Sequence, residues 1–282
     1  MMRFVAFLGV RVLRGKGGTA RYFRGAVLGI AISLVPLIVV MEVSTGMIEG
    51  ITARLLEVGT YHLQLALPPD TTVAPLADLA DAISAVPGVV AAVPERQGTA
   101  LLVSSRGAAG VSIRFVPPDV FARDSGFRSF ASVHAGSSDL SRTDTLLASS
   151  AMAASLGIKA GDKVTLLTTF GEDMSGLPRL TPLTVAGIYE TGYQELDATL
   201  AYAPLALADR VLSPRAVRTM IGIKVSDPFG DLAGVSRDVA EATGGSARVA
   251  TWREIEFARL GSFATTKALL LLNRARRGLE GE

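Results

Sequence analysis

The side chains that could do acid–base or metal chemistry are few in this sequence. Cysteine is absent, and the only two histidines are His62 and His134. Neither lies in an H-x-x-x-H pattern or beside paired carboxylates, which are the spacings that hold a zinc ion. We therefore expect no metal site and assign both histidines structural or exposed roles.

Two further motifs share residue types with catalytic signatures but lack their spacing. RGKGGT, residues 14–19, contains a lysine among glycines, yet no G-x-x-x-x-G precedes that lysine as a phosphate-binding loop requires. No serine lies in a G-x-S-x-G elbow, and the pair Glu172–Asp173 is interpreted as a solvated loop tip. The sequence thus predicts no catalytic residue, no cofactor and no enzyme.

The longest apolar stretch is GAVLGIAISLVPLIVVM, residues 25–41, which carries no charge. At about 1.5 Å per residue it covers roughly 25 Å, close to the hydrocarbon thickness of a bilayer. We predict a membrane-spanning helix. The alternative is a cleaved signal sequence, but no A-x-A-like site follows and a helical pattern continues beyond the stretch.

Charge is distributed unevenly about this span. Six basic residues and no acidic residue precede it, namely Arg3, Arg11, Arg14, Lys16, Arg21 and Arg24. The positive-inside rule therefore predicts a cytoplasmic N-terminus, with segment 1–24 at the cytoplasmic interface and everything after the span outside the cytoplasm. The remainder holds 22 basic against 26 acidic residues, a net charge of −4, which excludes a nucleic-acid-binding surface as the cause of the alkaline pI.

An apolar stripe continues the span into a predicted stalk, so that segment 25–58 forms one helix. Val43, Met47, Ile51 and Leu55 recur every four residues and share one helix face. An apolar stripe that leaves the membrane has no reason to face water. We expect it to contact a partner helix or the acyl chains of a cargo.

The region beyond the stalk predicts an α+β domain. A strand at 61–67, a helix in 68–86, a loop at 87–96 and a strand at 98–105 are followed much later by a strand at 221–226, a helix in 227–243 and a strand at 246–252. Two such strand–helix–strand units suggest a split βαβ sheet, with parts at 59–115 and 215–252. The β-rich insert 116–214 is then a second subdomain.

The insert contains one unusually long predicted connection. A short helix ends at Gly157, KVTLLTT (163–169) forms a strand, and a second strand at 183–193 follows a loop, FGEDMSGLPRLTP, residues 170–182. Loops of this length between strands are more often functional than two-residue hairpins are. We predict a binding role for this loop.

Several blocks together resemble the lipoprotein-releasing ABC permeases of the LolC/LolE type, within the wider MacB- and FtsX-like class. The segment from LGIAISLVPLIVV to YHLQL is similar to that family's first span and stalk. LGIKAGDKVTLLTT and VAGIYETGYQELDATLAYAPLALA are similar to two of its blocks, and VSDPFGDL and VATWREI to later positions. The resemblance covers residues 20–270.

The resemblance implies a βαβ-type porter part, a β-rich sabre part and no chemistry in the chain itself. It implies an inner-membrane protein with a periplasmic main domain, a cytoplasmic ABC ATPase that binds the ATP, and a second permease subunit. It also implies a lipoprotein cargo and a periplasmic lipoprotein carrier, which would dock on the loop through Gly171, Glu172, Pro178 and Arg179.

The sequence departs from the family at its end. The family has three further spans, whereas the last apolar run here stops at Leu272, so segment 253–282 is expected to be a return stalk and the truncated start of a second span. A split gene or a degenerate gene fragment would give the same pattern. The alternative function is a non-transporting FtsX-like scaffold that binds an envelope partner.

Overall fold

The computed structural model describes residues 18–68, 71–169, 178–213, 217–245 and 248–255. Its contacts divide the chain into two units, Met1–Ala53 and Arg54–Glu282, which we call the helix unit and the sheet unit. Each is described by itself.

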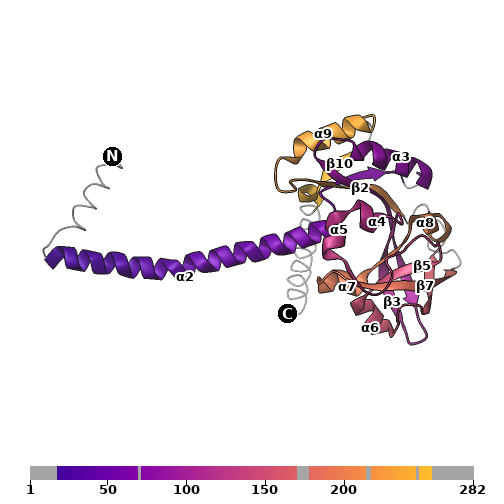
Figure 1. Ribbon diagram of the computed structural model, residues 1–282, viewed down its shortest axis with the longest axis horizontal. Coiled ribbons are helices and arrows are strands. Elements are labelled where there is room, and N and C mark those ends of the chain that lie inside the picture. The colour runs from indigo at the N-terminus through magenta and orange to yellow at the C-terminus, as the bar shows by residue number, and fades with distance from the viewer. Residues whose placement is uncertain (1–17, 69–70, 170–177, 214–216, 246–247, 256–282) are drawn as a thin grey trace, which may run out of the picture. The chain divides into compact units, whose positions relative to one another are not determined.

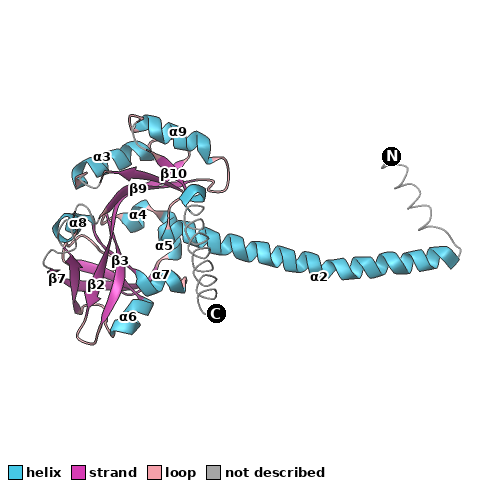
Figure 2. Ribbon diagram, turned by 180° about the vertical axis from the view of Figure 1, so that it is seen from behind, coloured by secondary structure: helices cyan, strands magenta, loops and turns pink. Residues whose placement is uncertain are grey.

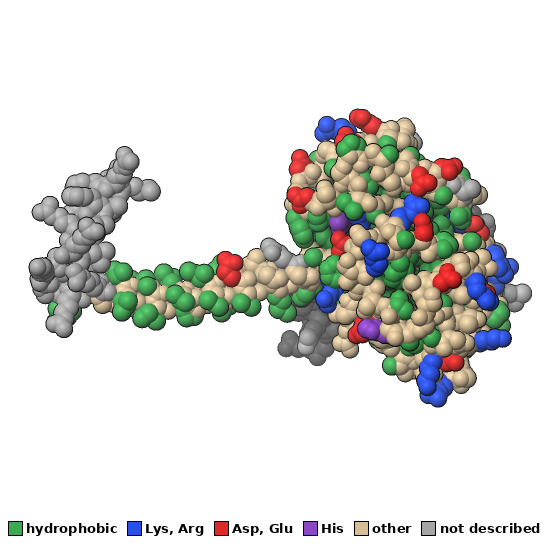
Figure 3. Space-filling view, in the orientation of Figure 1, with side chains coloured by type: hydrophobic (Ala, Val, Ile, Leu, Met, Phe, Trp, Pro, Cys, Tyr) green, Lys and Arg blue, Asp and Glu red, His purple; other side chains and the backbone are tan. Residues whose placement is uncertain are grey.

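The helix unit is built on one long helix, α2 (Gly18–Arg54), which continues through Pro36. The helical stretch Gly25–Gly59 is long and apolar enough to cross a membrane, and its large apolar side chains from Val27 to Met47 are exposed, as Figure 3 shows. The predicted helix is therefore confirmed. Its last turn is a short π-helix, η1 (Leu55–Gly59), which belongs to the sheet unit.

The sheet unit mixes strands and short helices (Figures 1 and 2). Its strands are β1 (Leu63–Leu67), β2 (Val89–Val103), β3 (Ala108–Val116), β4 (Ser132–Gly136), β5 (Thr145–Ser149), β6 (Lys163–Thr169), β7 (Pro178–Glu190), β8 (Leu200–Pro204), β9 (Arg218–Val225) and β10 (Val249–Thr251). Its helices are α3 (Val73–Ser84), α4 (Val120–Arg123), α5 (Ser125–Phe130), α6 (Ser150–Leu156), α7 (Gln194–Thr199), α8 (Leu205–Val211) and α9 (Leu232–Ala242).

One end of the sheet is an open, four-stranded part in the order β10-β1-β9-β2. It is assembled from β1–α3–β2 and β9–α9–β10, so the predicted split sheet is confirmed. Helices α3 and α9 lie together on one face of it in both ribbon views. Alternate strand residues such as Leu63, Leu65, Ile221 and Ile223 form a core beneath these helices, as period-2 apolar patterns require.

The other end of the sheet closes on itself. The pairings run β2–β3, β3–β8, β8–β5, β5–β7 and β7–β6, and β6 returns to β2. Strand β4 pairs with β7 outside this ring. The ring encloses a second core that includes Ile113, Phe115, Leu146, Leu166 and Val185, and closure removes the unpaired edges that an open sheet would expose.

Strand β2 joins the two ends, and this corrects one prediction. Residues 89–97, expected as a loop, are part of this long strand and pair with β9. Strand β3 pairs with β2 only from Arg96 onward, so Pro94 lies where one side of β2 carries no strand and its missing N–H is tolerated. Strands β2 and β3, predicted for the first porter part, also supply the barrel.

The predicted loop 170–182 is shorter in the structure. Its return arm, Pro178 to Pro182, is the start of β7 and pairs with β6 from Thr169 to Thr165. Strand β5 joins the other side of β7 only from Thr184, so both prolines lie on a half-paired strand. Residues 170–177 lie outside the described part of the chain.

We expect Gly136→Ala to destabilise the fold. Gly136 has φ +76° and pairs with Gly187 in the β4–β7 ladder, where an added Cβ would overlap the Ala186 carbonyl oxygen. Strain of this kind costs about 1–3 kcal/mol. Urea unfolding measures the change.

Gly110→Ala in β3 is the matched control, because nothing lies within 4 Å of its added Cβ and its φ is not in the left-handed region. It should leave stability unchanged or raise it by about 0.5 kcal/mol. Equal losses in both variants would contradict the assigned β4–β7 geometry.

Candidate functional site

The predicted apolar stripe lies on the surface of the helix. Val43, Met47 and Ile51 are 65%, 66% and 44% exposed, whereas Leu55 is half-buried at the start of η1. The structure thus leaves three of the four side chains available for contact with another molecule. That contact itself stays a prediction.

The predicted carrier-binding residues are only partly visible. Gly171 and Glu172 lie outside the described residues. Pro178 and Arg179 open β7 and are exposed, and the Arg179 guanidinium donates a hydrogen bond to the Arg210 carbonyl at the end of α8. Arg179 is therefore held against the barrel, and a role in carrier binding stays a prediction.

The two histidines have different surroundings. His134 is exposed and lies 3.1 Å from Glu190. His62 is buried: its Nδ1 accepts a hydrogen bond from the Val225 backbone N–H, and its Nε2 lies 3.3 Å from Glu57. Within the described ranges, no group of three His, Cys, Asp or Glu side chains could hold a metal ion.

A cluster of buried charged residues surrounds the end of the long helix. We call it the helix-end clamp; it consists of Glu57, Tyr61, His62, Glu95, Arg114, Asp124 and Lys224. The clamp draws on η1, the segment that follows it, strands β2, β3 and β9, and the residue that caps α5. All of it lies within the sheet unit.

The helix reaches this clamp through a π-turn. The Thr60 N–H donates to the Leu55 carbonyl at 2.9 Å, five residues back instead of four. The last carbonyls of a helix have no partners within it and carry partial negative charge. Two cations satisfy these groups here: Lys224 donates to Glu57 O at 2.8 Å, and Arg114 donates to Val58 O at 2.7 Å.

The Lys224 ammonium forms the polar half of the clamp. It also pairs with the Glu57 carboxylate and, at 2.8 Å, with Asp124, whose side chain accepts from Phe127 N and caps α5. Lys224 is 3% exposed and lies near the end of β9, between the buried residues Ile223 and Val225. One cation therefore binds η1 and α5 to β9.

Arg114 and Glu95 form the other half. Their side chains make a two-point ion pair, and Glu95 also accepts from Tyr61 at 2.7 Å and from Gln97 at 2.6 Å. Burial lowers the pKa of Arg114, but the charge of Glu95 and its hydrogen bond, together with Tyr61 and Tyr202, outweigh this and hold the pKa well above its usual value. Burial, reinforced by Glu95, raises the pKa of Tyr61 well above its usual value, so its neutral phenol remains a donor.

Two glycines leave room for the clamp. A Cβ at Gly126 would overlap the Glu57 carboxylate, and a Cβ at Gly222 would overlap the Tyr61 ring. The Tyr61 ring lies close to Gly222. The Arg114 guanidinium lies over the same ring, 5.1 Å from the ring centroid. Small residues at these two positions are thus part of the site.

The last described segment of the sheet unit lies beside the start of β1. The Trp252 N–H donates to the His62 carbonyl at 2.9 Å, next to the β1–β10 ladder. Thr251 and Glu254 cap the turn that follows, since Glu254 accepts from Thr251 N and Thr251 Oγ1 accepts from Glu254 N. This T-x-x-E capping box was readable in the sequence, and our sequence interpretation missed it.

The clamp residues themselves were also missed. The available signal was a charge inside a strand pattern, as at Lys224 in IGIKV and Arg114 in SIRFV. A charge at a position that apolar neighbours predict to be buried requires a partner. The sequence indicates that such partners exist but does not identify them.

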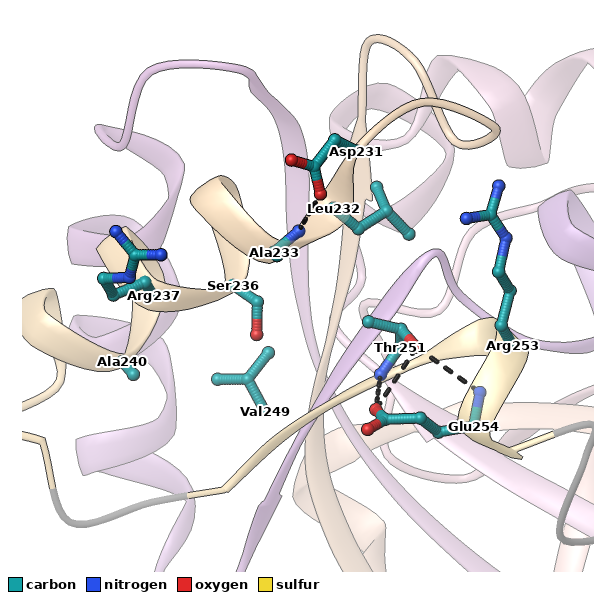
Figure 4. A pocket seen from close by; sticks show the side chains of 10 residues that line it. All are labelled: Asp231, Leu232, Ala233, Ser236, Arg237, Ala240, Val249, Thr251, Arg253 and Glu254. Carbon is teal, nitrogen blue, oxygen red and sulfur yellow. Dashed lines mark hydrogen bonds between the residues drawn. The ribbon is translucent and has the colours of Figure 1, made fainter.

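A cleft of about 530 Å³ lies between α9 and β10 (Figure 4). Its lining carries Asp231 and Glu254 against Arg237 and Arg253, so the formal charges balance. Glu254 is occupied by Thr251, and Arg253 donates to the Phe229 carbonyl. At least two of the four charged groups of the cleft are therefore engaged within the protein.

Comparisons with known proteins agree on one family. The family model of the MacB-like periplasmic core domain matches residues 25–241. The lipoprotein-releasing system transmembrane protein LolC of Xylella fastidiosa (strain 9a5c) is 28% identical over 258 residues, covering 87% of this chain and 59% of that protein. The LolC protein of Neisseria meningitidis serogroup B (strain ATCC BAA-335 / MC58) is 29% identical over 241 residues, covering 81% and 56%.

The chain spans less than two thirds of the length of these relatives. Among solved structures, the periplasmic region of MacB from Actinobacillus actinomycetemcomitans covers 72% of this chain and 94% of its own, at 10% identity and a TM-score of 0.45. That score is too low to support an argument about this chain.

The two halves of the clamp predict a large effect of Glu95→Gln. The change leaves the buried Arg114 cation without its counter-ion, and breaking a buried pair in this way costs about 3–5 kcal/mol. Thermal or urea unfolding of the full chain in detergent measures it. Asp144→Asn is the control, since its pair with Arg142 is exposed and its loss should leave stability nearly unchanged. A small loss in Glu95→Gln would mean that the pair is open to water.

Proposed function

Because the chain belongs to the MacB-like periplasmic core domain family, we propose that it is a permease subunit of an ABC transporter that releases lipoproteins from the inner membrane. One observation carries the proposal: the family match runs without interruption from the apolar helix through the split sheet and barrel to α9. The names of the LolC relatives supply the cargo class. The proposal places no chemistry in this chain.

The topology belongs to the same proposal. Basic residues before the helix favour a cytoplasmic N-terminus, which would put the sheet unit in the periplasm. A separate cytoplasmic ATPase would bind ATP, and a second permease subunit would complete the membrane part. Movement driven by the ATPase would then pass from α2 to the sheet unit as a rigid-body change.

We expect the full chain to support ATP-dependent lipoprotein release. The chain is produced with the ABC ATPase and permease encoded beside it, and the complex is reconstituted into liposomes that hold a lipoprotein. Adding ATP and a periplasmic lipoprotein carrier should transfer the lipoprotein to the soluble fraction. Failure of the chain to co-purify with an ATPase would contradict the proposal, and binding without release would favour the FtsX-like scaffold.

The same assay addresses the carrier loop. Pro178→Ala/Arg179→Ala should lower transfer to the carrier while ATP hydrolysis and melting temperature stay unchanged. Arg210→Ala is the control, because it removes a neighbouring guanidinium and keeps the carbonyl to which Arg179 donates. Equal losses in both variants would indicate a general charge effect, and no loss in either would exclude the loop as the docking site.

The exposed stripe on α2 should face another subunit or cargo. The chain has no cysteine, so Val43→Cys, Met47→Cys and Ile51→Cys each introduce a single thiol. In membranes that contain the complex, these positions should cross-link to the partner permease, whereas Glu49→Cys, at a different angle on the helix, should not. Cross-linking only from position 49 would show that the stripe faces elsewhere.

A further inference from the structure

Lys224 occupies an unusual place among the cations of the sheet unit. Its neighbours along β9 are apolar and buried, and its ammonium group makes three contacts, all at the end of the long helix or the start of α5. Glu57 and Asp124 are far from Lys224 and from each other in the sequence. The side chain therefore connects β9, η1 and the start of α5 through polar contacts.

The contacts divide between the two ends of the sheet. Lys224 and His62 attach η1 to the open part through β9 and β1. Arg114 and Tyr202 attach it to the barrel, since both approach Val58 O from β3 and β8. The Val58 side chain lies fully buried in the core between these parts, beside Val93, Tyr202 and Met220. Each part of the sheet thus has its own attachment to η1.

The connection between η1 and β1 contains no exposed linker. Residues 60–65, which follow η1, are all buried, so no exposed linker separates the helical end from β1. Glu57 is fixed at its carbonyl by one bond and at its carboxylate by others, all from the same ammonium group or from His62. These bonds fix η1 to β9 within the sheet unit.

Stability alone does not require charges here. Replacing a buried ion pair by apolar residues of similar volume is often neutral or stabilising. Charged hydrogen bonds are directional, however, and they hold one arrangement where apolar contact would allow sliding. The clamp therefore fixes position as well as contributing to the free energy of folding.

We infer that Lys224 is a positioning residue that passes movement of the membrane helix to the open part of the sheet. The inference rests on the proposed transport function, and it assigns the coupling to one side chain and one part of the fold. Arg114 serves the barrel in the same way.

The test uses the reconstituted complex and the ratio of lipoprotein released to ATP hydrolysed. The triple variant Lys224→Met/Glu57→Gln/Asp124→Asn removes the three contacts of Lys224 and leaves no orphaned buried charge, so the fold should persist, with a melting temperature lowered only by the loss of the donor to Glu57 O. We expect the ratio to fall about tenfold while ATP hydrolysis continues. The single variant Lys224→Arg keeps the cation. Its ratio of lipoprotein released to ATP hydrolysed should stay close to that of the wild-type complex.

Lys159→Met is the control, since Lys159 is an exposed lysine on the barrel. Wild-type release in the triple variant, at an unchanged ratio, would overturn the inference. If the triple variant does not fold, Glu57→Gln alone should still lower the ratio, and an unchanged ratio there would overturn it equally. A wild-type complex that never releases lipoprotein would instead refute the proposed function.

Discussion

The hydrogen bonds to the last carbonyls of the long helix are the constraint on which the sheet unit depends. Glu57 O and Val58 O are withdrawn from water, and a buried carbonyl without a donor costs free energy. Lys224 and Arg114 supply the donors, and each cation in turn needs a carboxylate. Glu57, Asp124 and Glu95 supply these carboxylates. The need for donors at the helix-end carbonyls thus explains the buried charges on β2, β3 and β9.

The barrel explains how this arrangement is kept rigid. Strand β2 leaves the open part at Arg96 and enters the ring, so Glu95 sits at the point where the two parts diverge. Arg114 pairs with Gln97 on the neighbouring strand, within reach of Glu95. Because the ring is closed, β3 cannot slide relative to β2 without breaking pairs around the whole circuit. The ion pair is therefore held by a register that many hydrogen bonds fix.

This construction agrees with the proposed role, in which the sheet unit receives movement from the membrane helix. Enzyme sites usually gather titratable groups around an accessible cavity. The charged groups of the clamp are instead buried or half-buried and pair with one another. Trp252 is also hydrogen-bonded to His62, so the end of β10 lies beside the segment that follows η1.

The sequence by itself determined the apolar helix, the two strand–helix–strand units and the helix end at Gly157, because helix and strand periodicities and a glycine at positive φ are local properties. The local pattern wrongly predicted loops at 89–97 and 178–182, because both segments contain prolines. In the structure these segments are strands, and prolines are tolerated there because one side of each strand is unpaired. Only the tertiary structure closed the barrel and chose the partners of Lys224 and Arg114. A charged residue at a position predicted to be buried indicates that a partner exists. The identity of that partner depends on contacts between segments far apart in the chain.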